Sequence, residues 1–167
     1  MMANPYRILM VCTGNICRSI MAEVIVKKQA ANRGINLVVE SAGVSTEETG
    51  NYIDPRAQRE LLAAGYSLPA HSAHQATRLE LESADLILAM TSYHARALNQ
   101  LCRSYSISDP DIRLFRTFDP ACAESSRIPD VEDPWYGGPS DFVVTRKTIE
   151  RCSPLILDYV EEELSAS

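Results

Sequence analysis

The sequence predicts an α/β fold of three layers, a four-stranded parallel sheet with helices on both faces. Short apolar runs that suit buried strands alternate along the chain with segments of helical periodicity, and this alternation is typical of parallel sheets. The 167 residues, 46% of them hydrophobic, suffice for one well-buried core. No internal repeat or low-complexity tract interrupts the chain. We therefore expect a single domain over residues 1–167.

The first half of the chain predicts two strands and the helix that joins them. Residues 6–11 are mostly apolar and read as the first strand. Residues 20–32 carry apolar side chains at helical spacing, with Ser19 as the expected N-cap and Gly34 just beyond the end. Residues 35–40 then predict the second strand.

The middle of the chain continues the alternation. Asp54 is placed to cap a helix that ends near Gly65. Residues 84–90 (ADLILAM) predict a buried third strand, residues 92–102 a helix, and residues 112–115 the fourth strand.

The last third begins with a polar stretch and closes with a helix. Residues 119–139 are rich in polar residues and proline, as expected of a long surface loop. Residues 141–164 predict the final helix, which Pro154 would kink or divide into two pieces.

The run from Cys12 to Ser19 follows the first strand, precedes a helix and combines residue types that handle oxyanions. Cys12 offers a thiolate nucleophile, which the N-terminus of a helix favours. Gly14 allows a tight turn, so that the backbone N–H groups of the loop can surround a tetrahedral anion. Arg18 stays charged and holds two oxygens at once, and Ser19 can place its hydroxyl on the Cys12 sulfur. Backbone and side-chain contacts to the anion are also expected from the residues between them, Thr13, Asn15, Ile16 and Cys17.

A cysteine at the end of a strand is more often a small buried apolar residue than a nucleophile. Here Cys12, Arg18 and Ser19 fit one mechanism at one strand-to-helix junction, which favours the phosphate-binding interpretation. The GxxxxGK[ST] and CxxC patterns are both absent from this loop. Right-handed crossovers would place this phosphate loop at the carboxyl edge of the first strand, where open α/β sheets bind ligands.

Four motifs, in their order and spacing, resemble the low-molecular-weight protein tyrosine phosphatases. They are residues 12–23 (CTGNICRSIMAE), 41–43 (SAG), 54–57 (DPRA) and 133–137 (DPWYG), and the resemblance extends over nearly the whole chain. Ile20 departs from the family, which usually has proline there, and this change should affect loop rigidity more than chemistry.

The resemblance implies hydrolysis of phosphotyrosine in proteins through a phosphocysteine intermediate. Cys12 would be the nucleophile, Arg18 would bind the phosphate, and Asp133 would act as general acid and then as base. A phenolate leaves slowly unless it is protonated, and a carboxyl beside bound phosphate is expected to keep its proton for that step. Asp130 and Glu132 are competing carboxylates, but the family motif has the acid directly before proline. No cofactor and no metal is implied.

The family also implies supporting roles around the loop. Asn15, Ser41 and His71 would join by hydrogen bonds beneath the phosphate site, although His71 on its own reads as a surface histidine. Cys17 would form a disulfide with Cys12 after oxidation and so protect it from sulfinic acid. The alternative is that Cys17 only packs within the loop.

The substrate preference depends on residues expected to wall the site. Trp135 and Tyr136 favour a long aromatic side chain such as phosphotyrosine, unless they are ordinary loop packing. Related enzymes that act on phosphoarginine tend to have threonine where this chain has Ile16, which again favours tyrosine. Glu47 is expected on the opposite wall, where it would disfavour acidic phosphopeptides or would simply be a solvated charge.

Three other functions remain open alternatives. A protein arginine phosphatase would use the same loop. An arsenate reductase would need two relay cysteines, and Cys102 and Cys122 are spaced too far apart for that pattern. A non-catalytic phosphotyrosine-binding module would not need Cys12 and Asp133.

Composition narrows the environment and the partners. The formal net charge of −6 argues against nucleic acid or an anionic membrane as the main partner, and favours phosphotyrosine-containing proteins. Five dispersed cysteines and the lack of a signal sequence or long apolar run predict a cytoplasmic location. Three scattered histidines give no zinc pattern, and the oligomeric state stays undetermined.

Overall fold

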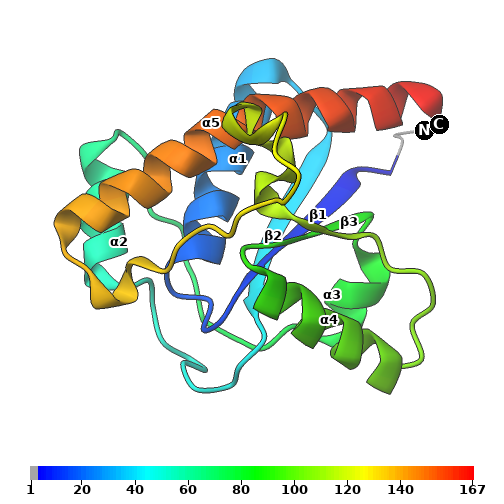
Figure 1. Ribbon diagram of the computed structural model, residues 1–167, viewed down its shortest axis with the longest axis horizontal. Helices are drawn as coiled ribbons and strands as arrows, with labels where there is room; N and C mark the ends of the chain where they lie inside the picture. Colours follow the sequence, from blue (N-terminus) through cyan, green and yellow to red (C-terminus); the bar gives the residue numbers. More distant parts are fainter. Residues whose placement is uncertain (1–3) are drawn as a thin grey trace.

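The computed structural model describes residues 4–167 and contains an all-parallel sheet with the strand order β2-β1-β3-β4. The strands are β1 (Tyr6–Cys12), β2 (Leu37–Gly43), β3 (Leu86–Ala89) and β4 (Ile112–Leu114). After β1 the chain first adds β2 on one side and then β3 on the other, so the strand order reverses beside β1 (Figure 1). The carboxyl edge at such a reversal is where open α/β sheets bind their ligands.

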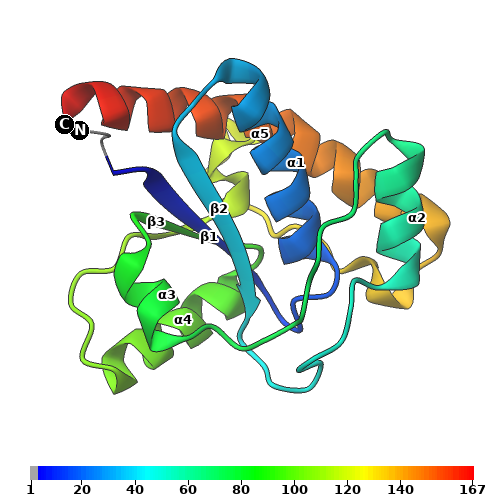
Figure 2. The ribbon, with the colours of Figure 1, turned by 180° about the vertical axis from the view of Figure 1, so that it is seen from behind.

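Helices cover both faces of the sheet, as the sequence predicts (Figures 1 and 2). The apolar residues of β1 alternate between two cores. Ile8 and Met10 belong to the larger core, whereas Leu9 and Val11 belong to the smaller one. The larger core is covered by α1 (Arg18–Arg33), α2 (Pro55–Ala63) and α5 (Pro139–Ala166), and the smaller by α3 (Arg78–Ser83) and α4 (Ser92–Ser104).

Of the predicted ends of the first two helices, one is wrong and two are confirmed. Ser19 is not the N-cap of α1, because the helix begins at Arg18 and the buried Ser19 hydroxyl lies 3.0 Å from the Cys12 sulfur instead. Gly34 ends α1 in the left-handed conformation, with φ of 67°. Asp54 caps α2 as expected, since its side chain accepts a hydrogen bond of 2.8 Å from the backbone N–H of Arg56.

One strand extends further than predicted, and one short helix is not predicted by the sequence pattern. The second strand reaches Gly43, because residues 41–43 pair in register with the last residues of β1 although they are small or polar. Helix α3 was not predicted, and its signal is a capping box in which Thr77 and Glu80 bond reciprocally. Single-turn 3₁₀ helices occur at η1 (Phe115–Phe118), η2 (Pro120–Cys122) and η3 (Pro134–Tyr136).

Helix α5 continues through Pro154 as one element, so of the two outcomes predicted there, a kink or a division into two pieces, the division is wrong. Its axis changes direction between the orange and red parts in Figure 1. The long loop before it is anchored to this helix by Asp119, which is fully buried and bonds to Arg151 and Arg116 at 2.8 and 2.9 Å. The Arg151 hydrogen bond is the main cause that holds the pKa of Asp119 well below its ordinary value. Within residues 4–167 no helix is long and apolar enough to cross a membrane.

Candidate active site

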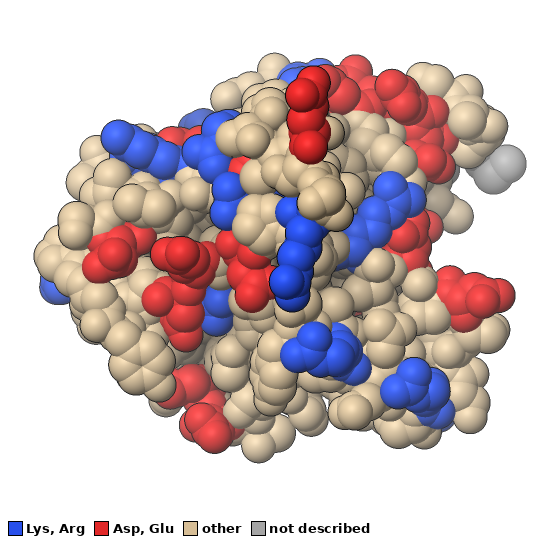
Figure 3. Space-filling view, in the orientation of Figure 1, with Lys and Arg blue, Asp and Glu red and all other residues tan. Residues whose placement is uncertain are grey.

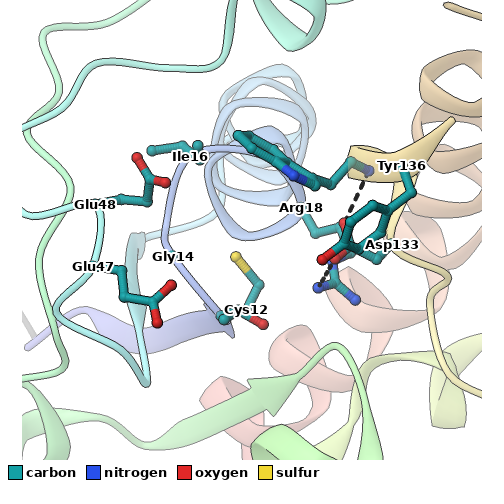
Figure 4. Close-up of a pocket in the computed structure, with 10 residues that line it drawn as sticks. Cys12, Gly14, Ile16, Arg18, Glu47, Glu48, Asp133 and Tyr136 are labelled. Atoms are coloured by element: carbon teal, nitrogen blue, oxygen red, sulfur yellow. Dashed lines mark hydrogen bonds and ion pairs between the residues drawn. The ribbon is translucent and has the colours of Figure 1, made fainter. Parts of the chain in front are cut away.

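A cavity of about 190 Å³ opens at the carboxyl end of β1, where the sequence predicts the phosphate loop. Figure 4 shows the Cys12 sulfur at its centre, with Glu47 and Glu48 on one side and Asp133 and Tyr136 on the other. Its lining comes from three distant segments of the chain, and consists of Cys12, Thr13, Gly14, Ile16, Arg18, Glu47, Glu48, Asp133, Trp135 and Tyr136.

The Cys12 thiol is buried and lies beside a buried hydroxyl that a neighbouring side chain also contacts. Ser19 Oγ is 3.0 Å from Cys12 Sγ and accepts a hydrogen bond of 2.9 Å from the Asn15 side-chain amide. Since Asn15 occupies a lone pair of that oxygen, the Ser19 proton can point at the sulfur. A hydroxyl in this position can donate a hydrogen bond to the Cys12 sulfur.

Arg18 is 4% exposed and offers one N–H group that has no partner in the described part of the chain. Its Nη1 donates to the Val131 carbonyl at 3.0 Å, and its Nη2 lies 3.5 Å from Asp133 Oδ2. Its Nε is buried without an acceptor. A buried guanidinium N–H without a partner is costly, so an oxyanion in this cavity would satisfy it.

Asn15 is held in a left-handed conformation, with φ of 63°, by contacts to several segments. Its side-chain amide donates to Ser41 Oγ at 3.0 Å, and Ser41 Oγ donates to Glu23 at 2.8 Å. His71 Nε2 lies 2.7 Å from the Asn15 carbonyl, and the Asn15 side chain accepts from the His74 backbone at 3.3 Å. The structure thus brings Asn15, Ser41 and His71 together, and adds Glu23, for which no role was predicted.

The reason for glycine at position 14 differs from the expected one. Gly14 is not among the residues with positive φ, so no special turn requires it. A Cβ there would instead lie 2.8 Å from Cγ of Glu48, whose side chain packs over the loop. Gly43 at the end of β2 is equally close to the loop, because a Cβ would lie 2.5 Å from the Thr13 carbonyl oxygen.

His94 on α4 is a second residue that sequence reasoning missed. Its Nε2 lies 2.8 Å from Thr13 Oγ1, and its Nδ1 is buried without a partner among the described residues. Burial and the nearby charge of Arg18 lower the pKa of His94 to about 4, although Asp130 opposes this shift. His94 is therefore neutral at physiological pH. His94 can be recognised as part of the site only from the structure, because its partner Thr13 lies 81 residues away in the sequence.

The loop with Asp133 is more open than the sequence suggested. Asp133 caps η3 by accepting from the Trp135 backbone at 3.0 Å. Its side chain is 41% exposed, and Tyr136 is 91% exposed, so the two aromatics do not wall the carboxyl off from water. Arg56 supports Trp135 by lying 5.2 Å from its ring centroid and donating to its carbonyl at 2.9 Å. Arg56 belongs to the DPRA motif, but the motif alone does not predict this contact.

Cys17 is buried at the N-cap of α1 and is in the same core as Cys12. Burial is the main cause that raises the pKa of the Cys17 thiol, and the carboxylate of Asp54 adds to it. Cys17 therefore stays a thiol. Its neighbour Ile16 lines the cavity and holds the segment before α2 through a backbone bond of 2.9 Å from Asp54.

Comparison with known proteins agrees with this geometry. The family model for low molecular weight phosphotyrosine protein phosphatase matches residues 7–166. Low molecular weight protein-tyrosine phosphatase A of Mycobacterium tuberculosis is 39% identical over 166 residues, covering 98% of this chain and 97% of that protein.

Solved structures show the same architecture. A protein tyrosine phosphatase from Entamoeba histolytica has a TM-score of 0.82 and 25% identity, over 95% of this chain and 98% of that one. The arginine phosphatase YwlE from Geobacillus stearothermophilus has a TM-score of 0.77 and 27% identity, over 95% of both chains. With these matches over nearly its whole length, the chain belongs to the low molecular weight phosphotyrosine protein phosphatase family.

Proposed function

We propose that this phosphatase hydrolyses phosphotyrosine in proteins through a phosphocysteine intermediate. The observation that carries the proposal is the buried Arg18, which lines the same cavity as Cys12 and has an Nε–H without a partner among the described residues. A fixed cation with a free donor beside a nucleophile suits a phosphate group in both the ground state and the transition state.

In the first step, the Cys12 sulfur attacks phosphorus while Arg18 and the loop N–H groups hold the non-bridging oxygens. The S–P bond forms as the bond from phosphorus to the phenol oxygen breaks. Asp133 gives its proton to that oxygen, so the phenol leaves as a neutral molecule.

In the second step, Asp133 takes a proton from water, and the water oxygen attacks phosphorus. The S–P bond breaks, inorganic phosphate is released, and Ser19 receives the returning thiolate with a hydrogen bond. Because Asp133 is partly exposed, water reaches it without a further opening of the loop.

Phosphotyrosine is favoured over phosphoarginine by the apolar Ile16 and by Trp135, which both line the cavity. A flat aromatic ring packs well between such walls. Phosphoarginine remains the second candidate, because an arginine phosphatase is among the structural relatives. Rates on matched phosphotyrosine, phosphoarginine and phosphoserine peptides would decide, and a preference for phosphoarginine would contradict the proposal.

The reductase and binding-module alternatives fit the geometry less well. Cys102 belongs to the smaller core, on the other face of the sheet from Cys12, so it is not placed to relay a disulfide. A binding module has no need for a carboxylate such as Asp133 at the cavity. Arsenate reduction measured beside aryl phosphate hydrolysis separates the three functions.

Two substitutions test the chemistry directly. Cys12→Ser should abolish turnover and keep phosphate binding, and substantial residual hydrolysis would refute the mechanism. Asp133→Ala should slow aryl phosphates with poor leaving groups more than those with good ones. Equal losses across the series would argue against Asp133 as the acid.

Cys17 is proposed as a redox guard for the nucleophile. Once peroxide converts Cys12 to sulfenic acid, condensation with the Cys17 thiol would form a disulfide and release water. A thiol reductant would then return both cysteines to their reduced form.

A further inference from the structure

The two sides of the cavity mouth differ in chemistry. One side carries two consecutive acidic residues, Glu47 and Glu48, and the other carries Asp133 and the aromatic ring of Tyr136 (Figure 4). Trp135 also lines the cavity. Glu47 is exposed, and Glu48 is half-buried. In Figure 3, acidic side chains are seen at the lower left of the molecule, where the segment after β2 lies in Figure 1 and where Glu47 and Glu48 are its exposed or half-buried acidic residues.

The segment that carries the two glutamates is held in a defined conformation. The Glu47 backbone N–H donates to Ser45 Oγ at 3.0 Å, and the Glu48 carboxylate accepts from the Asn51 side chain at 2.7 Å. The Glu48 stem packs directly over Gly14, where even a methyl group would collide with it. The acidic side therefore belongs to the wall of the site, rather than to a freely moving loop.

Arg18, which lines the same cavity, has a buried Nε–H without a partner among the described residues, and such a donor favours an anionic ligand. A phosphate bound there leaves the rest of the substrate at the mouth, between the aromatic and the acidic sides. Neighbouring residues of an extended peptide lie about 3.3 Å apart along the chain, so residues flanking the phosphorylated one come within reach of the glutamates. Carboxylates at that position attract a cationic side chain and repel an anionic one.

We propose that Glu47 and Glu48 select substrates in which a lysine or arginine flanks the phosphotyrosine, and reject substrates with acidic flanks. This inference rests on the proposed function, because it concerns the part of the phosphotyrosine substrate outside the phosphate loop. An exposed ion pair changes an equilibrium by about 1.5- to 5-fold. The two glutamates attract a basic flanking residue and repel an acidic one. Together these effects make kcat/KM about tenfold higher for a peptide with basic flanks than for one with acidic flanks.

The test compares three phosphotyrosine peptides that differ only in their flanking residues, which are lysine, alanine or glutamate. Wild-type protein is measured beside Glu47→Gln/Glu48→Gln, which keeps the side-chain shape and removes both charges. Glu82→Gln/Glu162→Gln is the matched control, because it changes the net charge equally at exposed sites on α3 and near the end of α5. p-Nitrophenyl phosphate, which has no flanking residues, reports the chemistry alone.

We expect wild type and the control to prefer the lysine-flanked over the glutamate-flanked peptide about tenfold at low salt. The preference should shrink toward 1 in Glu47→Gln/Glu48→Gln and in about 1 M salt, where charges are screened within about 3 Å. Equal ratios in wild type and Glu47→Gln/Glu48→Gln would overturn the inference. If wild type does not hydrolyse p-nitrophenyl phosphate at all, the proposed function is overturned instead. The two failures are therefore distinguishable.

Discussion

Acidification should destabilise this protein through His94, because its imidazole is buried in the neutral form. The pKa of His94 is about 4 in the folded protein, against about 6.5 in an unfolded chain. Between these values only the unfolded chain binds the proton, so the free energy of unfolding falls as the pH falls. At about 1.4 kcal/mol per pKa unit, the loss is about 2 kcal/mol at pH 5 and about 3 kcal/mol below pH 4.

Urea unfolding of wild type and His94→Gln at pH 7.5, 6 and 5 measures this contribution. Glutamine cannot titrate and can still reach Thr13, so the variant should lose about 2 kcal/mol less than wild type between pH 7.5 and 5. His74 titrates in the same range with the opposite sign, because Glu80 raises its pKa against the effect of burial, but it is present in both proteins and cancels in the difference. Parallel losses in the two proteins would refute the assignment of a buried neutral imidazole at position 94.

Three further predictions concern other parts of the structure. Asp119→Asn should lower the free energy of unfolding by about 3 kcal/mol in urea titrations, because it removes the buried carboxylate between two arginines. Gly43→Ala should lower kcat/KM for aryl phosphates by about tenfold or more and weaken inhibition by phosphate, since its Cβ would displace the Thr13 carbonyl; unchanged kinetics would contradict the close approach. Cys17→Ser should recover less activity with a thiol reductant after peroxide treatment than wild type, and equal recovery would exclude a protective disulfide with Cys12.

The elements of the fold were predictable because their signals are local. The apolar run of β3 and the N-cap at Asp54 lie within a few residues of the structure they specify. Ser19 was misread for the same reason. A serine before an apolar helical pattern is ordinarily a cap, and only the bond with Cys12 across the loop shows why it lies inside the helix.

The surroundings of the site were less predictable because they depend on contacts between distant segments. His94 meets Thr13 across 81 residues, and Arg56 meets Trp135 across 79. Glu48 could not be distinguished from a solvated glutamate until the fold placed its stem on Gly14. Motifs therefore identified the expected reacting groups and the supporting residues Asn15, Ser41 and His71. The contacts of Glu23, His94 and Arg56 came only from the structure.

The contacts of Arg18 couple the phosphate site energetically to the loop that carries Val131 and Asp133. The Arg18 guanidinium, whose Nε–H has no partner among the described residues, also donates to the Val131 carbonyl and pairs with Asp133, so it anchors the loop that carries the proposed general acid. Removing Arg18 would release that loop as well as the phosphate. The losses from Arg18→Ala and Asp133→Ala should therefore not add, and the double variant should be less impaired than the product of the two single effects.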